Sequence, residues 1–252
     1  MNELRSQPQV RLFCFPYAGA GASVFRDWSS ALPATIEVVP VQYPGRENRV
    51  RETLINRIER LVTTLRGELG DLNIPFAFFG HSMGALVSYE LARKLHEEGK
   101  PGPVHLFVSG RRAPDRIDED PLLHQSDNHT LIEKLREFEG TPEAIFQYPE
   151  LLAFWVQIFR ADLEACETYE YGNGTPLSCP ITAFGGLEDT HVSQADIVAW
   201  QRHTRGEFAS HMLPGNHFFL KQSREKLLNT ICDDLNRAGF GDGLFGNRFF
   251  AV

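Results

Sequence analysis

The chain has little of what marks several protein classes. Its four cysteines are scattered over 252 residues without a C-x-x-C spacing, so neither a disulfide framework nor a metal site is expected. No apolar run approaches the length of a membrane span. The first ten residues are polar and lack the apolar core of a secretory signal. We therefore expect a protein of the reducing cytoplasm with no membrane contact.

A basic stripe is also missing. The formal net charge is −8, which argues against a nucleic-acid partner. The hydrophobic content of 42% is that of a globular protein, and 252 residues suffice for one α/β domain of ordinary core size. No internal repeat is visible. We expect a single domain over residues 1–252, acting as a monomer.

The most informative motif lies where a strand pattern changes into a helical one. Residues 76–79 are apolar, and Gly-His-Ser-Met-Gly follows at residues 80–84, which fits the nucleophile elbow Gly-x-Ser-x-Gly. A serine turned sharply out of a strand needs neighbours without a Cβ, because strand and helix nearly touch there. The helix that follows directs its unpaired N–H groups and its positive dipole end toward the serine. The motif predicts Ser82 as a nucleophile.

Strand and helix patterns alternate along most of the chain. This alternation predicts a mostly parallel sheet with helices on both faces. The strand patterns cover residues 11–15, 36–41, 76–79, 104–108, 179–184 and 208–213. Helical spacing predicts one helix that contains Leu54, Ile58, Leu61, Val62 and Leu65, another over residues 197–202, and a final helix to about Asn236 that Ser223 caps. From about residue 116 to 172 no strand pattern appears, and the segment is acidic and rich in aromatic residues. An insertion of this length is typical of a cap or lid. The tail from Gly239 to Val252 is rich in Gly and Phe, and its pattern indicates neither a structure nor a role.

A serine hydroxyl needs a base, and the base needs a third group to hold it. Such groups gather at the carboxyl ends of the strands in a sheet of this kind. Of the nine histidines, only His217 lies in a turn directly after the last strand pattern. Asp189 follows the preceding strand, and the order Ser, Asp, His is that of α/β-hydrolases. Asp115, which follows the strand at 104–108, remains an alternative acid.

Two loops have open interpretations. The loop at residues 16–23 contains Gly-Ala-Gly, but the third glycine of a dinucleotide site is missing, and no acidic ribose ligand follows the next strand. Such a loop can instead supply an oxyanion-hole N–H, which predicts Ala18 and Met83 as backbone donors. Residues 44–49 are densely charged, and a solvated loop and a functional one are both open.

Several stretches, in the same order along the chain, resemble the type II thioesterases that accompany nonribosomal peptide and polyketide synthases. The matching segments are residues 15–19, 44–47, 79–85, 109–114, 180–186 with Asp189, and 214–219. The resemblance implies an α/β-hydrolase fold with a helical lid at about 116–172. It also implies hydrolysis of acyl thioesters on the phosphopantetheine arms of carrier domains, without a cofactor or metal of its own.

In this resemblance Ser82, Asp189 and His217 fall on the family's triad positions. Ala20 stands where a second glycine is common, and Asn216 where an acidic residue often precedes the histidine. Two alternatives remain open. The same triad would serve an acyltransferase or a product-releasing thioesterase. The second alternative is a non-catalytic protein that binds carrier domains, which an intact triad makes less favourable.

Overall fold

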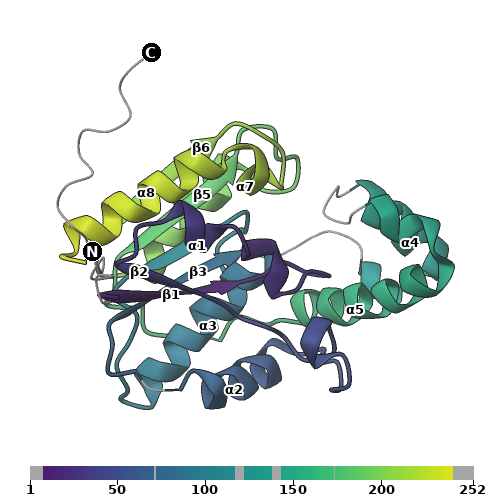
Figure 1. The fold of residues 1–252 in the computed structure, drawn as a ribbon, viewed down its shortest axis with the longest axis horizontal. Helices are drawn as coiled ribbons and strands as arrows, with labels where there is room; N and C mark the ends of the chain where they lie inside the picture. Colours follow the sequence, from purple (N-terminus) through teal and green to yellow (C-terminus); the bar gives the residue numbers. More distant parts are fainter. Residues whose placement is uncertain (1–7, 71, 117–121, 138–142, 173, 241–252) are drawn as a thin grey trace, which may run out of the picture.

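The computed structural model describes residues 8–70, 72–116, 122–137, 143–172 and 174–240. At its centre is a six-stranded sheet of order β2-β1-β3-β4-β5-β6, in which every neighbouring pair is parallel (Figure 1). The strands are β1 (Val10–Phe15), β2 (Ile36–Pro40), β3 (Phe76–His81), β4 (Leu106–Ser109), β5 (Ile181–Gly186) and β6 (Phe208–Leu213). All six predicted strands are present, although β4 begins at Leu106 and leaves His105 outside it.

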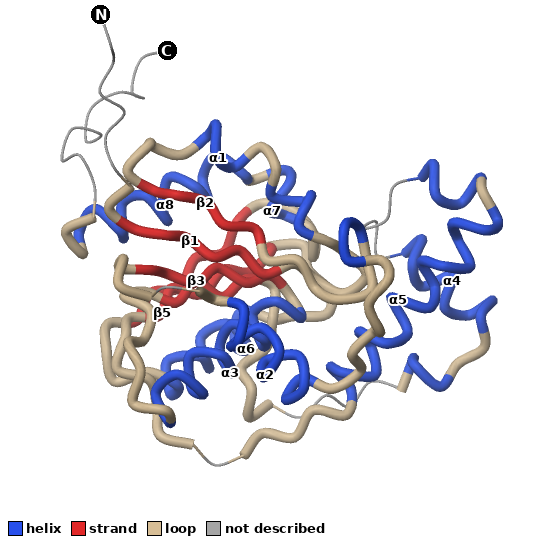
Figure 2. Tube along the Cα trace, turned by 60° about the horizontal axis from the view of Figure 1, so that its bottom comes forward, coloured by secondary structure: helices blue, strands red, loops and turns tan. Residues whose placement is uncertain are grey.

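Helices cover both faces of the sheet, as predicted (Figures 1 and 2). One face carries α1 (Trp28–Ala31), α7 (Phe219–Gln222) and α8 (Arg224–Arg237). The other carries α2 (Ile58–Glu68), α3 (Met83–Glu97) and α6 (Gln194–Val198). Short 3-10 helices are η1 (Ala22–Phe25), η2 (Glu47–Arg49) and η5 (Ala199–His203).

Strand β3 shows why the central strands are apolar throughout. Phe76 and Phe78 pack into the core on the α2–α3 side, whereas Ala77 and Phe79 pack into the core on the α1–α8 side. Successive side chains point to opposite faces, so a strand buried on both faces needs no polar position. The strand thus delivers the residue that follows it, Ser82, from a rigid buried element.

Three details of the predicted helices are wrong. Helix α2 begins at Ile58 and does not include Leu54. The Leu54 side chain packs against Gly45 so closely that a Cβ at Gly45 would collide with it. The helix expected at 197–202 is α6 followed by η5, and it starts earlier because Ser193 and Asp196 form a capping box. Ser223 precedes α8 but does not cap it, because its hydroxyl donates to the Pro214 carbonyl at 2.7 Å.

Between β4 and β5, the described residues from Leu123 to Glu167 form helices joined by short connections. They comprise η3 (Leu123–Gln125), α4 (Asn128–Glu137), η4 (Glu143–Gln147) and α5 (Pro149–Glu167), which we call the helical insertion. Helices α4 and α5 extend beyond one end of the sheet in both views (Figures 1 and 2). The insertion has a small apolar cluster of its own, made of Leu131, Leu135, Val156 and Phe159. Residues 117–121 and 138–142 of the expected lid, and 241–252 of the tail, lie outside the described residues.

Candidate active site

Ser82 lies at the turn between β3 and α3. Its backbone has φ 52° and ψ −115°, a strained conformation for a residue with a side chain. A Cβ at Gly80 would collide with the Gly84 carbonyl oxygen, and a Cβ at Gly84 with the Phe15 carbonyl oxygen. The two glycines of the motif are therefore required by packing, because the chain turns back on itself within one residue.

The start of α3 supplies donors beside the serine. The helix begins at Met83, whose N–H belongs to the first turn and has no carbonyl partner within the helix. The N–H of Ser82 itself donates to the Ser109 carbonyl at 2.7 Å, which continues the pairing of β3 with β4. The bond to Ser109 thus holds the turn against β4, and the N-terminal end of α3 is directed at Ser82.

His217 and Asp189 meet at the carboxyl ends of β6 and β5. His217 Nδ1 lies 2.8 Å from Asp189 Oδ2, and the other carboxylate oxygen accepts from the N–H groups of His191, at 2.8 Å, and Val192, at 3.2 Å. The Asp189 side chain is fully buried. Burial alone would raise the pKa of Asp189, but the hydrogen bond and charge of His217, together with the two backbone donors, lower it on balance. The group is therefore a carboxylate at neutral pH.

Close contact between two loops brings this pair together. An added Cβ at Gly186 would lie 2.5 Å from the Asn216 carbonyl oxygen, and the Glu188 N–H donates to Gly215 at 3.0 Å. The Asn216 side-chain oxygen accepts from the Phe218 N–H at 2.9 Å. An acidic residue would offer the same acceptor, so asparagine at this position preserves the turn that carries His217.

The alternative acid, Asp115, belongs to a different histidine. Its carboxylate lies 2.9 Å from His203 Nε2 and 3.2 Å from an Arg202 guanidinium nitrogen. His203 Nδ1 is in turn 3.1 Å from the Tyr89 hydroxyl. The geometry thus joins His217 to Asp189 and His203 to Asp115.

His81, the residue before Ser82, packs beneath His217. Its Nδ1 is 2.9 Å from the Ser109 hydroxyl, and its ring centre is 5.3 Å from that of His217. Complete burial is the main cause that lowers the pKa of His81 well below its usual value. The ring is therefore neutral and does not compete with His217 as a base.

Ser82 and His217 line one small apolar cavity of about 90 Å³. Its remaining walls come from the loop after β1, from the helical insertion and from the residue after His217: Tyr17, Ala18, Gly19, Leu135, Trp155, Phe159, Leu163 and Phe218. A larger hollow of about 750 Å³ lies between α2, α3 and the end of α5, but it is lined by charged residues and reaches neither Ser82 nor His217. Of these two hollows, the small cavity is the one that adjoins Ser82 and His217.

A family model described as a thioesterase domain matches residues 10–235. The chain belongs to the thioesterase domain family. It is 44% identical to the gramicidin S biosynthesis protein GrsT of Aneurinibacillus migulanus, over 92% of this chain and 91% of that protein. RedJ, a thioesterase from the prodiginine pathway of Streptomyces coelicolor, is 40% identical with a TM-score of 0.84, over 89% of each chain. BorB, a type II thioesterase from the borrelidin cluster, is 36% identical with a TM-score of 0.83, over 90% of this chain and 92% of its own.

These likenesses confirm the predicted α/β-hydrolase fold and the resemblance to type II thioesterases. The protein is a hydrolase acting on thioesters. Among the described residues no helix of the thioesterase is both long and apolar enough to cross a membrane. Over the same part of the chain, no cluster of three His, Cys, Asp or Glu side chains is suited to a metal ion.

Sequence reasoning missed two residues beside the site of the thioesterase, Arg46 and Asp162. The solvated interpretation of residues 44–49 is wrong for Arg46, which is 3% exposed and ion-paired with the fully buried Asp162. The interpretation fits only the following residues, Glu47 and Asn48, which are exposed. The available signal was helical spacing, because Asp162 lies three residues from both Phe159 and Ala165 and so falls on the face that the helix buries, where a charge requires a partner.

Proposed function

We propose that this thioesterase hydrolyses acyl thioesters carried on the phosphopantetheine arms of carrier domains, as an editing enzyme of a nonribosomal peptide or polyketide synthase. The observation that carries the proposal is the shared apolar cavity of Ser82 and His217, with Asp189 hydrogen-bonded to the far side of the His217 ring. The likeness to BorB, a type II thioesterase of a biosynthetic cluster, supports the substrate class.

The chemistry proceeds in two acyl-transfer steps. His217 takes the proton of Ser82 as the serine oxygen attacks the thioester carbonyl, and the oxyanion is held by the N–H groups of Ala18 and Met83. The intermediate collapses, and the pantetheine thiol leaves with the proton from His217. Water then attacks the acyl-serine with His217 as base. The bond between the Ser82 oxygen and the acyl carbon breaks as Ser82 takes the proton back from His217, and the free acid departs. Asp189 keeps the ring in the tautomer that accepts at Nε2 and stabilises its charged form.

The helical insertion acts as the lid in this proposal. Leu135, Trp155 and Phe159 form a wall of the cavity that contains Ser82, so the pantetheine arm reaches the serine when part of this wall moves. The carrier brings the arm, and the enzyme therefore needs no cofactor or metal of its own. We place the enzyme in the cytoplasm, in keeping with its cysteines at positions 14, 166, 179 and 232, none of which forms a disulfide. We also propose that it acts as a monomer.

A comparison of two substrates tests the role of the carrier. One acyl group is presented on a cognate carrier domain and on a short pantetheine thiol, and kcat/KM is measured for both. The carrier substrate should react faster, because contacts away from the reacting carbon add binding energy in the transition state. Equal values would leave a general hydrolase of small thioesters.

The competing activities predict different products. The hydrolase releases only free acid when an alcohol or amine is added, whereas an acyltransferase forms an ester or amide, and a product-releasing thioesterase forms a ring. A non-catalytic carrier-binding partner would bind acylated carriers without turning them over. Product analysis by mass spectrometry with a panel of acylated carriers distinguishes these outcomes.

A further inference from the structure

A buried ion pair connects the helical insertion to the loop after β2. Arg46 makes two hydrogen bonds with Asp162 of α5, at 2.5 and 2.8 Å, and the two side chains are 4% and 0% exposed. The Asp162 oxygen nearer to Gly19 also accepts from the Gly19 N–H at 2.7 Å. The carboxylate therefore joins three segments that are far apart in the sequence, and one of them is the loop that follows β1.

Stability alone is a weak reason for such a pair. Removing two charges from water is costly, and well-packed apolar residues often stabilise a fold equally well. Burial by itself would lower the pKa of Arg46, but the charge and hydrogen bonds of Asp162 outweigh it and raise the pKa, so Arg46 remains charged. What an apolar pair could not provide is a fixed acceptor for the Gly19 N–H.

The loop after β1 is held at both ends by the same group of residues. The Tyr43 hydroxyl donates to the Pro16 carbonyl at 3.1 Å, and the Arg46 guanidinium lies over the Tyr43 ring at 5.4 Å. Arg46 also donates to the Ala20 carbonyl at 3.2 Å. Between these anchors Gly19 has φ +79°, and its N–H is directed at Asp162. The bond to Asp162 fixes the Ala18–Gly19 peptide plane. The Tyr17–Ala18 plane, which carries the Ala18 N–H, is held by the Tyr17 carbonyl, which accepts from the Ala20 N–H at 3.0 Å.

We propose that Asp162, held by Arg46, is a positioning residue for the oxyanion hole. It binds the Gly19 N–H and so orients the neighbouring Ala18 N–H toward the cavity beside Ser82. This inference rests on the proposed function, since it concerns the same hydrolysis. It also limits the lid: the second half of α5 must stay in place while the oxyanion hole is formed, so opening takes place in α4 and the first half of α5.

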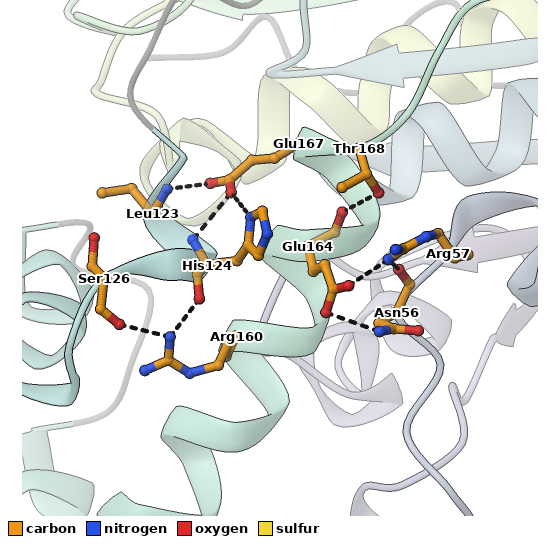
Figure 3. A network of polar contacts seen from close by, with 9 residues as sticks. All are labelled: Asn56, Arg57, Leu123, His124, Ser126, Arg160, Glu164, Glu167 and Thr168. Atoms are coloured by element: carbon orange, nitrogen blue, oxygen red, sulfur yellow. Dashed lines mark hydrogen bonds and ion pairs between the residues drawn. The ribbon is translucent and has the colours of Figure 1, made fainter.

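Further contacts fix the second half of α5 without touching the loop after β1 (Figure 3). Glu164 accepts from Arg57 at 2.5 Å and from Asn56 at 2.8 Å, at the start of α2. Glu167 accepts from the backbone N–H groups of Leu123 and His124, both at 3.0 Å. Glu164 lies two residues beyond Asp162 and ties α5 to α2, so it serves as a matched control for anchoring alone.

The test uses two double variants that both remove the buried charges. Arg46→Leu with Asp162→Asn retains a side-chain oxygen for the Gly19 N–H, whereas Arg46→Leu with Asp162→Leu does not. We expect kcat on an acylated carrier to be about tenfold to a hundredfold lower in the second variant than in the first, with KM changed less than about threefold. Affinity for a trifluoromethyl ketone analogue, whose adduct with Ser82 carries the oxyanion, should fall by the same factor. Affinity for an unreactive thioether analogue should not change.

Glu164→Gln should keep kcat within about twofold of the parent enzyme. Equal kcat in the two double variants, both folded by circular dichroism, would overturn the positioning role. An equal loss for the ketone and the thioether would also overturn it, because a disturbed pocket would then be the cause. A drop in Glu164→Gln as large as in the Asp162→Leu variant would assign the effect to anchoring of α5. If the parent enzyme shows no Ser82-dependent hydrolysis, the proposed function fails instead, and the two failures are thus distinguishable.

Discussion

Replacing Asp189 by asparagine should inactivate the enzyme through the tautomer of His217. One Asp189 oxygen accepts from two backbone N–H groups, those of His191 and Val192, and the other faces His217 Nδ1. In Asp189→Asn the amide oxygen must occupy the first position, because an NH₂ group there would face two donors. The NH₂ group then donates to Nδ1, so His217 carries its proton on Nε2 and cannot take the proton of Ser82.

The expected loss in kcat is about 10³- to 10⁴-fold, equivalent to about 4–5.5 kcal/mol in activation free energy. The assay is steady-state hydrolysis of an acylated carrier near neutral pH, with thermal unfolding to verify the fold. Asp115→Asn is the matched control, because Asp115 also binds a histidine, His203, at 2.9 Å. Its kcat should stay within about threefold of the parent. Full activity in Asp189→Asn, or an equal loss in both variants, would refute the reasoning.

Three further predictions concern the nucleophile, the cavity and pH. Ser82→Ala should lower kcat by about a thousandfold or more while thermal unfolding shows an intact fold, and near-normal turnover would remove Ser82 from the mechanism. Trp155 lines the cavity, so Trp155→Ala should raise kcat/KM for longer acyl chains relative to acetyl by about tenfold; an unchanged chain-length profile would mean that the acyl group lies elsewhere. The lowered pKa of Asp189 stabilises the fold above about pH 4, and this stabilisation is lost as pH falls further. The free energy of unfolding, from urea titrations at about pH 5 and pH 3, should therefore fall more in the parent than in Asp189→Asn, and parallel falls would contradict this.

The sequence predicted the parts of the site that depend on local pattern. Ser82 is marked by the two glycines that flank it, and both are needed because their added Cβ atoms would meet backbone within the turn. His217 is marked by its place after the last strand, since parallel strands bring their carboxyl ends to one edge. The alternating strand and helix patterns likewise predicted that helices cover both faces of the sheet.

The remaining features depend on contacts between distant segments. Asp189 and Asp115 both follow strands, and only the folded chain shows which histidine each one meets. Arg46 and Asp162 are separated by 116 residues, and no local periodicity connects them. The helix expected around Leu54 failed for the same reason, because that side chain covers Gly45 in a neighbouring loop instead of continuing the helical face.

The placement of the helical insertion has a consequence for how acyl specificity can evolve. Strands β4 and β5 are parallel hydrogen-bonded neighbours, so the insertion belongs to the crossover that runs from the carboxyl end of β4 to the amino end of β5, outside the sheet. The insertion also packs around its own cluster, which includes Leu135 and Phe159. Its sequence can therefore diverge, or be exchanged with that of another thioesterase, without disturbing strand pairing. The boundary between the segment that can be exchanged and the segment that must be kept then falls inside helix α5. The part of α5 up to Phe159 can be replaced by that of another thioesterase. The part from Asp162 onward must stay with the sheet and the loop after β1.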